Sequence, residues 1–456
     1  MLSKVAILSV FCLLAGGINY GTALTNLPVQ IVTKYASITH FDPDNPTITS
    51  LIEVSFCIGA ALGSSVSQLI TRKMSYPKAL MMFFGLAILM NVVQIIPIHW
   101  IYLVSCRTVS GFITSGINSI APLQVASQLS AHHREKAMMM YDFSLNAGVT
   151  LAYLIHFGIS FDYNYWQFTF LAPILCNITG ALVAMTLIKA SKAARQIQTL
   201  KKFVEDQEEK EPLVHESITV QHSASDYPAP MSLDHNLMNE VQNAVKKPQL
   251  SRKQLNRIKY VAFAIGAFQM LTGIDAIVMY SSDIFETEFG SVRAGILGSV
   301  LLGVVNLITI VVSAQFVGKI QRRKMLLFGI IGVSVCNISI GCCYLLNINK
   351  REIYIMALTV LFQIFYCSGP EPLVFMMFSE MFPEEHKNQL NSLAYSTNWV
   401  ANILVVFTFQ FFFDHLWILY FFYAVCTLGF GLSGVALAPE TCGKSLEEIE
   451  QQLLQW

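Results

Sequence analysis

Residues 294–317 read AGILGSVLLGVVNLITIVVSAQFV, a stretch that contains no charged side chain. An α-helix rises about 1.5 Å per residue, so a helix over this stretch can cross the roughly 30 Å hydrocarbon core of a bilayer. Comparable apolar stretches recur along the whole chain, which predicts an all-α integral membrane protein with about twelve transmembrane helices. The predicted spans are 5–25, 51–71, 78–98, 100–122, 137–160, 166–189, 260–281, 294–317, 325–347, 353–379, 392–413 and 415–437.

The composition favours a bilayer over water as the solvent for this chain. Of its 456 residues, 54% are hydrophobic and 13% are charged, whereas soluble domains carry about 25% charged residues. The formal net charge is +0, which argues against nucleic acid or another charged polymer as a partner. The sequence contains no nucleotide-binding loop, nucleophile elbow or metal-ligand spacing, so we expect no enzyme activity, no cofactor and no metal site.

A charged stretch at 191–258 divides the predicted spans into six before it and six after it. This layout predicts two six-helix halves, 1–190 and 259–438, packed around a binding site near the middle of the membrane. The stretch 191–258 is predicted to be a cytoplasmic linker with short amphipathic helices. Residues 439–456 are predicted to form a cytoplasmic tail.

Basic residues in short loops predict the orientation, because such loops stay on the cytoplasmic side. The loop after 51–71 carries Arg72 and Lys73, and the loop before 325–347 carries three basic residues in a row. A basic pair at 350–351 goes against this bias. Both termini and the linker are therefore predicted to be cytoplasmic, in a multi-pass protein that we expect in the plasma membrane.

The span at 260–281 carries an unusual number of polar side chains, namely Gln269, Thr272, Asp275 and Tyr280. Polar and ionisable groups inside a membrane are costly unless they face a polar cavity or the interior of a helix bundle. An isolated Thr or Ser could instead bond a neighbouring helix. The whole set, with Gly273 inside it, favours a lined binding site. Uncharged donors and acceptors beside an aromatic face suit a sugar.

The same segment resembles the sugar porter family of the major facilitator superfamily and is similar to facilitative glucose and hexose transporters. Residues 269–276 read QMLTGIDA, where the family has Gln-Gln-Leu-(Ser/Thr)-Gly-Ile-Asn-Ala. PETCGK at 439–444 is similar to the family's Pro-Glu-Thr-Lys-Gly-Lys ending, and SEMFP at 379–383 to its Ser-Glu-(Ile/Leu)-Phe-Pro element. NW at 398–399, with Asn402, is similar to its Asn-Trp-x-x-Asn motif. The resemblance covers nearly the whole chain and implies the major facilitator fold and transport of a small sugar.

The resemblance also implies roles for individual residues. A gate is implied at Tyr280 on the outer side and at the helix break formed by Gly369, Pro370 and Pro372. The implied substrate-binding residues are Gln269, Asp275, Asn306, Asn398, Asp142, Phe375 and Trp399. A charged cytoplasmic latch that closes the inner side is implied for Arg107, Arg134, Arg322, Arg323, Glu380 and Lys387.

Three acidic residues, Asp142, Asp275 and Glu371, stand where the family has neutral groups. A carboxylate at membrane depth costs about 2.5–3.5 kcal/mol on insertion scales. In the simplest interpretation these acids bond hydroxyl or backbone groups in place of amides. They could instead carry a proton with the sugar, although Gly21 stands at the position of the acid that is typical of proton-coupled relatives. A third interpretation is a cationic substrate.

The sequence therefore predicts a facilitative uniporter for a monosaccharide, with glucose or another hexose as the expected substrate. The alternatives are a proton-coupled sugar symporter, a sugar sensor that does not transport, and a carrier of a cationic solute. The expected partners are a small sugar, the lipid bilayer and, in the symport alternative, protons.

Overall fold

The structure is a computed structural model that describes residues 4–25, 29–42, 45–129, 131–208, 250–346, 348–383, 385–444 and 446–455. Within these ranges the regular secondary structure is helical and contains no strand. Nine helical segments of the described ranges are long and apolar enough to cross a membrane, judged by length and composition. Some of these segments join two of the helices named below.

The helices before residue 209 pack mainly on one another, and we call them the N-terminal helices. The long helix pairs α3 and α5, α1 and α6, and α4 and α7 form the main contacts. At the start of α3, Asn45 caps the helix by accepting from the backbone N–H of Thr47, and Pro46 fits the first helical position. The N-terminal helices are α1 (Lys4–Leu24), α2 (Val29–Thr39), α3 (Pro46–Lys73), α4 (Tyr76–Gln94), α5 (Trp100–Ala126), α6 (Ala131–Ile159), η1 (Tyr163–Phe170) and α7 (Leu171–Glu208).

The helices after residue 249 form the second set, which we call the C-terminal helices. Its first member begins with a capping box, in which Ser251 and Gln254 bond each other's backbone N–H groups. The C-terminal helices are α10 (Arg252–Leu271), α11 (Ile274–Phe289), α12 (Val292–Ser313), α13 (Arg322–Leu346), α14 (Arg351–Ser368), α15 (Pro370–Glu380), α16 (Lys387–Phe409), η2 (Gln410–His415), α17 (Leu416–Leu437) and α18 (Leu446–Leu454).

The two sets meet along a seam in which α3 packs against α16 and α6 against α12. Gly303 of α12 allows the close approach to α6, since a Cβ atom there would lie 2.7 Å from Oγ1 of Thr150. One apolar cluster crosses the seam and joins Phe56 of α3 to Tyr280 of α11 and Phe409 of α16.

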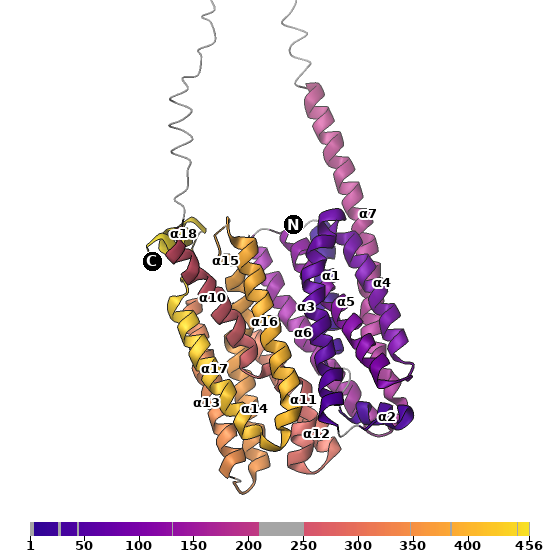
Figure 1. Cartoon of the computed structure of the whole chain (residues 1–456). Helices are drawn as coiled ribbons and strands as arrows, with labels where there is room; N and C mark the ends of the chain where they lie inside the picture. Colours follow the sequence, from indigo (N-terminus) through magenta and orange to yellow (C-terminus); the bar gives the residue numbers. More distant parts are fainter. Residues whose placement is uncertain are drawn as a thin grey trace, which may run out of the picture.

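The bundle has two distinct ends (Figure 1). The end at which α1 and α10 begin and α18 lies is called here the linker end, because α7 runs out of the bundle there. The opposite end, where α2 lies, is called the α2 end. The cluster that crosses the seam lies towards the α2 end. Helix α11 ends there at Phe289, and Tyr280 of the cluster is in the third turn before that end.

The described helices differ from the predicted spans in three ways. The spans at 260–281 and 353–379 are each divided into two helices, because Gly273 has a φ of +86° and Gly369 leaves helical geometry. Helices α2, η1 and α18 were not predicted. The predicted amphipathic helix after residue 190 is not a separate element, because α7 continues through it to Glu208. Residues 209–249 of the predicted linker lie outside the described ranges.

Candidate functional site

The site begins at the break between α10 and α11. The break puts Asp275 in the first turn of α11, where the free backbone N–H groups of a helix favour a negative charge. Asn402 of α16 donates its side-chain amide to Asp275 and lies 3.3 Å from the sulfur of Met270. The predicted site residue Asp275 is therefore held by an amide from a neighbouring helix.

Two predicted substrate-binding amides lie next to this break and contact each other. Asn398 of α16 donates to Oε1 of Gln269 at 2.9 Å and to the carbonyl of Gly266 at 3.1 Å. Gln269 in turn donates to the carbonyl of Pro370 at 3.3 Å. The side chains of Gln269 and Asn398 are 1% and 5% exposed, respectively. These uncharged donors and acceptors form a compact polar cluster among α10, α15 and α16.

A second polar group crosses the seam between the two sets of helices. Asn146 of α6 donates to Oε1 of Glu371 at 2.7 Å and accepts from Asn306 of α12 at 2.5 Å. The oxygen of Asn306 accepts from the thiol of Cys367 at 2.5 Å. The predicted residue Asn306 is thus bonded to both sets of helices. Because Glu371 follows Pro370, this group adjoins the Gln269 cluster.

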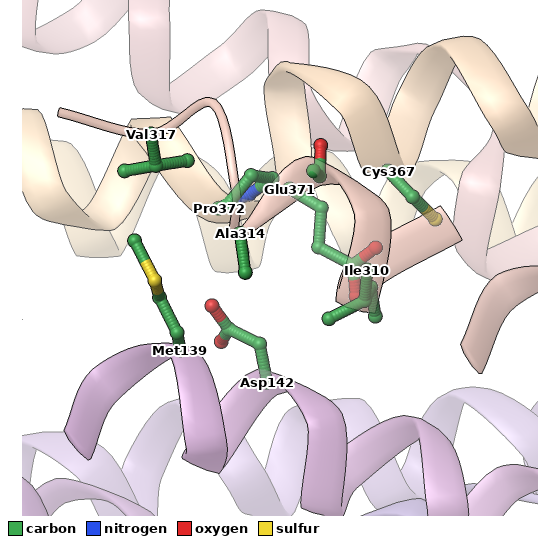
Figure 2. A pocket seen from close by; sticks show the side chains of 9 residues that line it. Met139, Asp142, Ile310, Ala314, Val317, Cys367, Glu371 and Pro372 are labelled. Carbon is green, nitrogen blue, oxygen red and sulfur yellow. The ribbon is translucent and has the colours of Figure 1, made fainter. Parts of the chain in front are cut away.

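Asp142 lies across a cavity from Glu371 (Figure 2). The cavity is small and is lined from α6 by Met139 and Asp142, and from the C-terminal helices by Ile310, Cys367, Glu371 and Pro372 among others. Figure 2 shows Asp142 pointing from α6 towards the C-terminal segments that carry Ala314 and Glu371. The structure therefore brings two of the three unusual acids to one cavity at the seam.

The two predicted aromatic residues differ in what they contact. Phe375 of α15 stacks on Tyr395 of α16, with ring centroids 5.4 Å apart. It is 36% exposed, so it retains a free face. Trp399 is half-buried on α16.

The predicted gate positions lie on two separate elements. Tyr280 of α11 stacks on Phe409 with ring centroids 4.6 Å apart and donates to the carbonyl of Val406 at 3.3 Å. Pro370 begins α15 directly after the break at Gly369. A Cβ atom at Gly369 would lie 2.5 Å from the carbonyl oxygen of Met325, so this break depends on glycine. Pro372 lines the cavity described above.

Most of the predicted charged latch lies at the linker end of the C-terminal helices. Arg322 pairs with Glu380 at 2.7 Å. Glu440 accepts from the backbone N–H groups of Arg322 and Arg323, at 3.1 and 3.3 Å, and so caps α13. Lys387 is half-buried at the start of α16. The side chain of Arg134 lies outside the described residues.

The assignment of Arg107 to this latch is wrong. Arg107 is in the second turn of α5, towards the α2 end, whereas Arg322 begins α13 at the linker end. Its guanidinium pairs with Glu53 of α3 at 3.0 Å, donates to the carbonyl of Ala23 at 2.9 Å and lies over the ring of Phe56. The match to the family identified an arginine but did not show its depth in the bundle. It therefore could not distinguish an ion pair at the α2 end from a latch at the linker end.

Sequence analysis assigned no site role to four polar residues that complete these groups. They are Glu53, Asn146, Asn402 and Glu440. A signal existed for two of them, because Asn146 and Asn402 each lie four residues after a predicted site residue and therefore share its helix face. Glu53 had no such signal, since its partner Arg107 is distant in sequence. Within the described part of the chain, no three His, Cys, Asp or Glu side chains gather at a point that could hold a metal ion.

Buried amides and acidic side chains beside helix breaks, in an all-helical apolar protein, are typical of a polytopic membrane carrier, because polar groups at membrane depth are costly unless they serve a solute. The family described as "Sugar (and other) transporter" matches residues 5–453. The chain therefore belongs to this sugar transporter family and is a sugar transporter rather than an enzyme.

Individual relatives agree with this assignment. The glucose transporter GlcP of Staphylococcus epidermidis is 24% identical over 416 residues, which cover 90% of each chain. The mouse solute carrier family 2, facilitated glucose transporter member 2, is 25% identical over 457 residues, which cover 95% of this chain and 84% of the relative. Among solved structures, the major facilitator superfamily proton:xylose symporter XylE superposes with a TM-score of 0.74 at 18% identity over 99% of this chain and 100% of that chain. The fold is thus shared with the major facilitator superfamily.

Proposed function

We propose that this sugar transporter carries a monosaccharide, glucose or another hexose, by facilitative uniport. The observation that carries the proposal is the buried cluster of Gln269 and Asn398 beside Asn402, whose amides supply several uncharged donors and acceptors within two helices. A hexose presents several hydroxyl groups that both donate and accept, and such amides match them without a net charge. Glucose is named for two of the relatives reported above.

The proposed mechanism is alternating access around a site at the seam. In this mechanism the chain crosses the membrane twelve times, in two six-helix halves at 1–190 and 259–438. The contacts that support it are those between α3 and α16 and between α6 and α12, because each seam contact can open while the helices within each set stay packed. In this proposal Tyr280 gates the α2 end, while the break from Gly369 to Pro372 moves α15 against the cavity. The pair of Arg322 and Glu380 belongs to a latch at the linker end.

The proposed orientation places the linker end in the cytoplasm and the α2 end outside, in the plasma membrane. Described basic side chains at the linker end support it, because cytoplasmic loops carry an excess of Lys and Arg. Arg72, Lys73 and Lys78 are exposed there. Protease or antibody access to an epitope added at the C-terminus, in intact and permeabilised cells, tests this orientation. Access in intact cells contradicts it.

Uptake of labelled D-glucose into proteoliposomes tests the substrate. Saturable uptake that ends at equal concentrations inside and outside is the expected result of uniport. The variant Asp275→Asn keeps the volume and the hydrogen bond to Asn402 and should retain transport if the acid acts only as a substitute for an amide. Complete loss of transport by Asp275→Asn contradicts this role of the acid.

A proton-coupled symporter is the second candidate, and one observation favours it. Asp142 and Glu371 line one cavity from opposite sides of the seam, so a proton on either acid could respond to movement between the two sets of helices. An imposed pH gradient separates the candidates. Accumulation of sugar against its own gradient only when the outside is acidic supports symport and contradicts uniport, and Glu371→Gln should then abolish the accumulation while equilibrium exchange continues.

A carrier of a cationic solute and a sensor that does not transport are weaker candidates. The first rests on the three acids alone, and competition of glucose uptake by a panel of sugars and amines tests it. The second is contradicted by any saturable uptake that depends on the protein.

A further inference from the structure

A buried amide of a neighbouring helix contacts the break between α10 and α11. Asn337 of α13 donates its side-chain N–H to the carbonyl oxygen of Thr272 at 3.1 Å. Thr272 is the C-cap residue of α10, and Gly273 turns the chain after it. Both Asn337 and Thr272 are 0% exposed. The amide therefore satisfies a backbone carbonyl at the point where the regular helix is interrupted.

Among the described residues, this is the hydrogen bond that the side chain of Asn337 makes. Within the described residues, the other polar atom of its side chain, Oδ1, has no hydrogen-bond partner. A buried amide that leaves one of its polar atoms unpaired is costly, so its presence inside α13 calls for a reason. Holding the carbonyl of Thr272 supplies one.

A second element fixes the same point through shape. The ring of Tyr423 from α17 packs on Gly273, so that a Cβ atom there would lie 2.4 Å from Cδ2 of the ring. Tyr423 is 1% exposed. Because α13 and α17 pack closely on each other, the break is held by two neighbouring helices, through the Asn337 amide of α13 and the Tyr423 ring of α17.

The helix that starts at this break reaches the seam at the α2 end. Tyr153 of α6 donates to the carbonyl of Val278 at 2.5 Å, which ties α11 to the N-terminal helices. One turn further, Ser281 donates to the hydroxyl of Tyr153 at 3.3 Å, which is a second contact across the seam, and the hydroxyl groups of Ser281 and Ser282 contact that of Ser299 in the neighbouring α12, at 2.7 and 3.1 Å. The same helix therefore carries Asp275 of the candidate site at one end and seam contacts further along.

We propose that Asn337 is a positioning residue that holds α11 at the angle at which the α2 end of the seam is closed. The bond to Thr272 sets the direction in which α11 leaves the break, and the contact of Tyr423 with Gly273 limits its pivot. Losing the amide donor leaves a buried carbonyl unpaired and favours other angles of α11, in which Val278 and Tyr153 separate.

Thiol labelling of a buried reporter in α11 tests this role in the full-length protein in detergent. Ser282→Cys is nearly isosteric, and Ser282 is 3% exposed, so iodoacetamide reaches the reporter only when α11 moves. Peptide mass spectrometry follows its labelling with and without Asn337→Leu, which fills the volume but has no donor. The labelling rate should rise about tenfold, since an unsatisfied buried carbonyl shifts an equilibrium by this order. Asn337→Thr, which retains a hydroxyl donor, should restore part of the slow rate.

Two controls separate a local role from general loosening. Native Cys12 of α1 is 0% exposed, and its labelling rate should not change. Asn91→Leu is the matched control variant, because Asn91 is also a buried amide that donates to a backbone carbonyl, that of Ala87 at 2.8 Å, but within an unbroken helix. It should leave the reporter unchanged. If Asn337→Leu is not recovered as folded protein, Asn337→Ala gives the same comparison without added bulk.

An unchanged reporter rate in a folded Asn337 variant overturns the proposal, as does an equal rise at Cys12, which marks a merely structural residue. These outcomes are independent of the substrate, because no sugar is needed for the labelling. A failure of glucose uptake would therefore count against the proposed function and leave the role of Asn337 standing.

Discussion

The buried ion pair of Arg107 and Glu53 gives the sharpest prediction about stability. The two side chains are 1% and 9% exposed and lie 3.0 Å apart, at the α2 end of the N-terminal helices. The variant Glu53→Gln removes the negative charge and keeps the shape. It leaves the Arg107 guanidinium buried with a carbonyl partner at Ala23 and the ring of Phe56, but without this counter-ion.

The expected cost follows from these contacts. Removing one partner of a buried pair costs about 3–5 kcal/mol, chiefly because the other charge remains buried without compensation. The amide oxygen of glutamine can still accept one hydrogen bond, and the Phe56 ring retains a cation–π contact of about 1–2 kcal/mol. We therefore expect the lower end of the range, about 3 kcal/mol of lost stability.

Thermal unfolding in detergent micelles, followed by intrinsic fluorescence, measures this loss. Glu53→Gln should melt well below the natural protein. The double variant Glu53→Gln with Arg107→Gln should regain part of the difference, because the buried charge is gone, with a coupling energy of about 2 kcal/mol. Lys73→Gln is the control, since Lys73 is exposed at the other end of the same helix α3.

Two results would contradict the expected cost of the unpaired Arg107 charge. One is a melting temperature of Glu53→Gln equal to that of Lys73→Gln, which would mean that the charge of Arg107 is hydrated despite its burial. The other is a double variant whose losses simply add, because additive losses show that the two side chains do not interact.

Three further predictions concern single positions. Gly273→Ala should abolish folded expression or transport, because alanine at a φ of +86° is strained by about 1–2 kcal/mol and its Cβ would lie 2.4 Å from the Tyr423 ring; normal uptake by this variant contradicts the rigid break. Arg322→Ala should lower thermal stability by about 1–3 kcal/mol through loss of the charged hydrogen bond to Glu380, and uptake identical to that of the natural protein would remove the pair from any latch. Glu440→Gln should cost about 1 kcal/mol, because the cap on the first N–H groups of α13 loses its charge, and an unchanged melting temperature would show that the cap is dispensable.

The sequence was sufficient for the class of fold because the signal is collective. A helix in a bilayer needs a long apolar stretch, and this requirement leaves a pattern that does not depend on any one residue. Predicted spans such as 325–347 therefore agree with α13 to within a few residues. The helical breaks are different. Gly273 was noticed, but whether a glycine bends a helix depends on what packs against it, here the ring of Tyr423.

The candidate site was predicted in part, for a related reason. The motif at 269–276 located Gln269 and Asp275, and the motif at 398–399 located Asn398, because each motif is local in sequence. Pairings between distant segments left no such trace. The bond from Asn146 to Glu371 joins positions 225 residues apart, and only the packing of α6 against the C-terminal helices brings them together.

The error over Arg107 has the same origin. Its match to the family placed it among charged residues, but the identity of a residue does not show at which end of the bundle the residue lies. The distance along α5 from Trp100 determines that it lies towards the α2 end, and Glu53 of α3 determines its partner. Depth in the bundle has to be counted from the helix ends, and those ends became definite only in the structure.

Facilitative hexose transport by this protein can be measured as zero-trans uptake of labelled D-glucose into proteoliposomes, without any ion or pH gradient. We expect saturable uptake that is inhibited by unlabelled D-glucose, is not inhibited by L-glucose, and stops when the internal and external concentrations are equal. Uptake no greater than that of protein-free liposomes, or uptake inhibited by amines and not by sugars, would contradict the proposal that this chain is a facilitative carrier of a hexose.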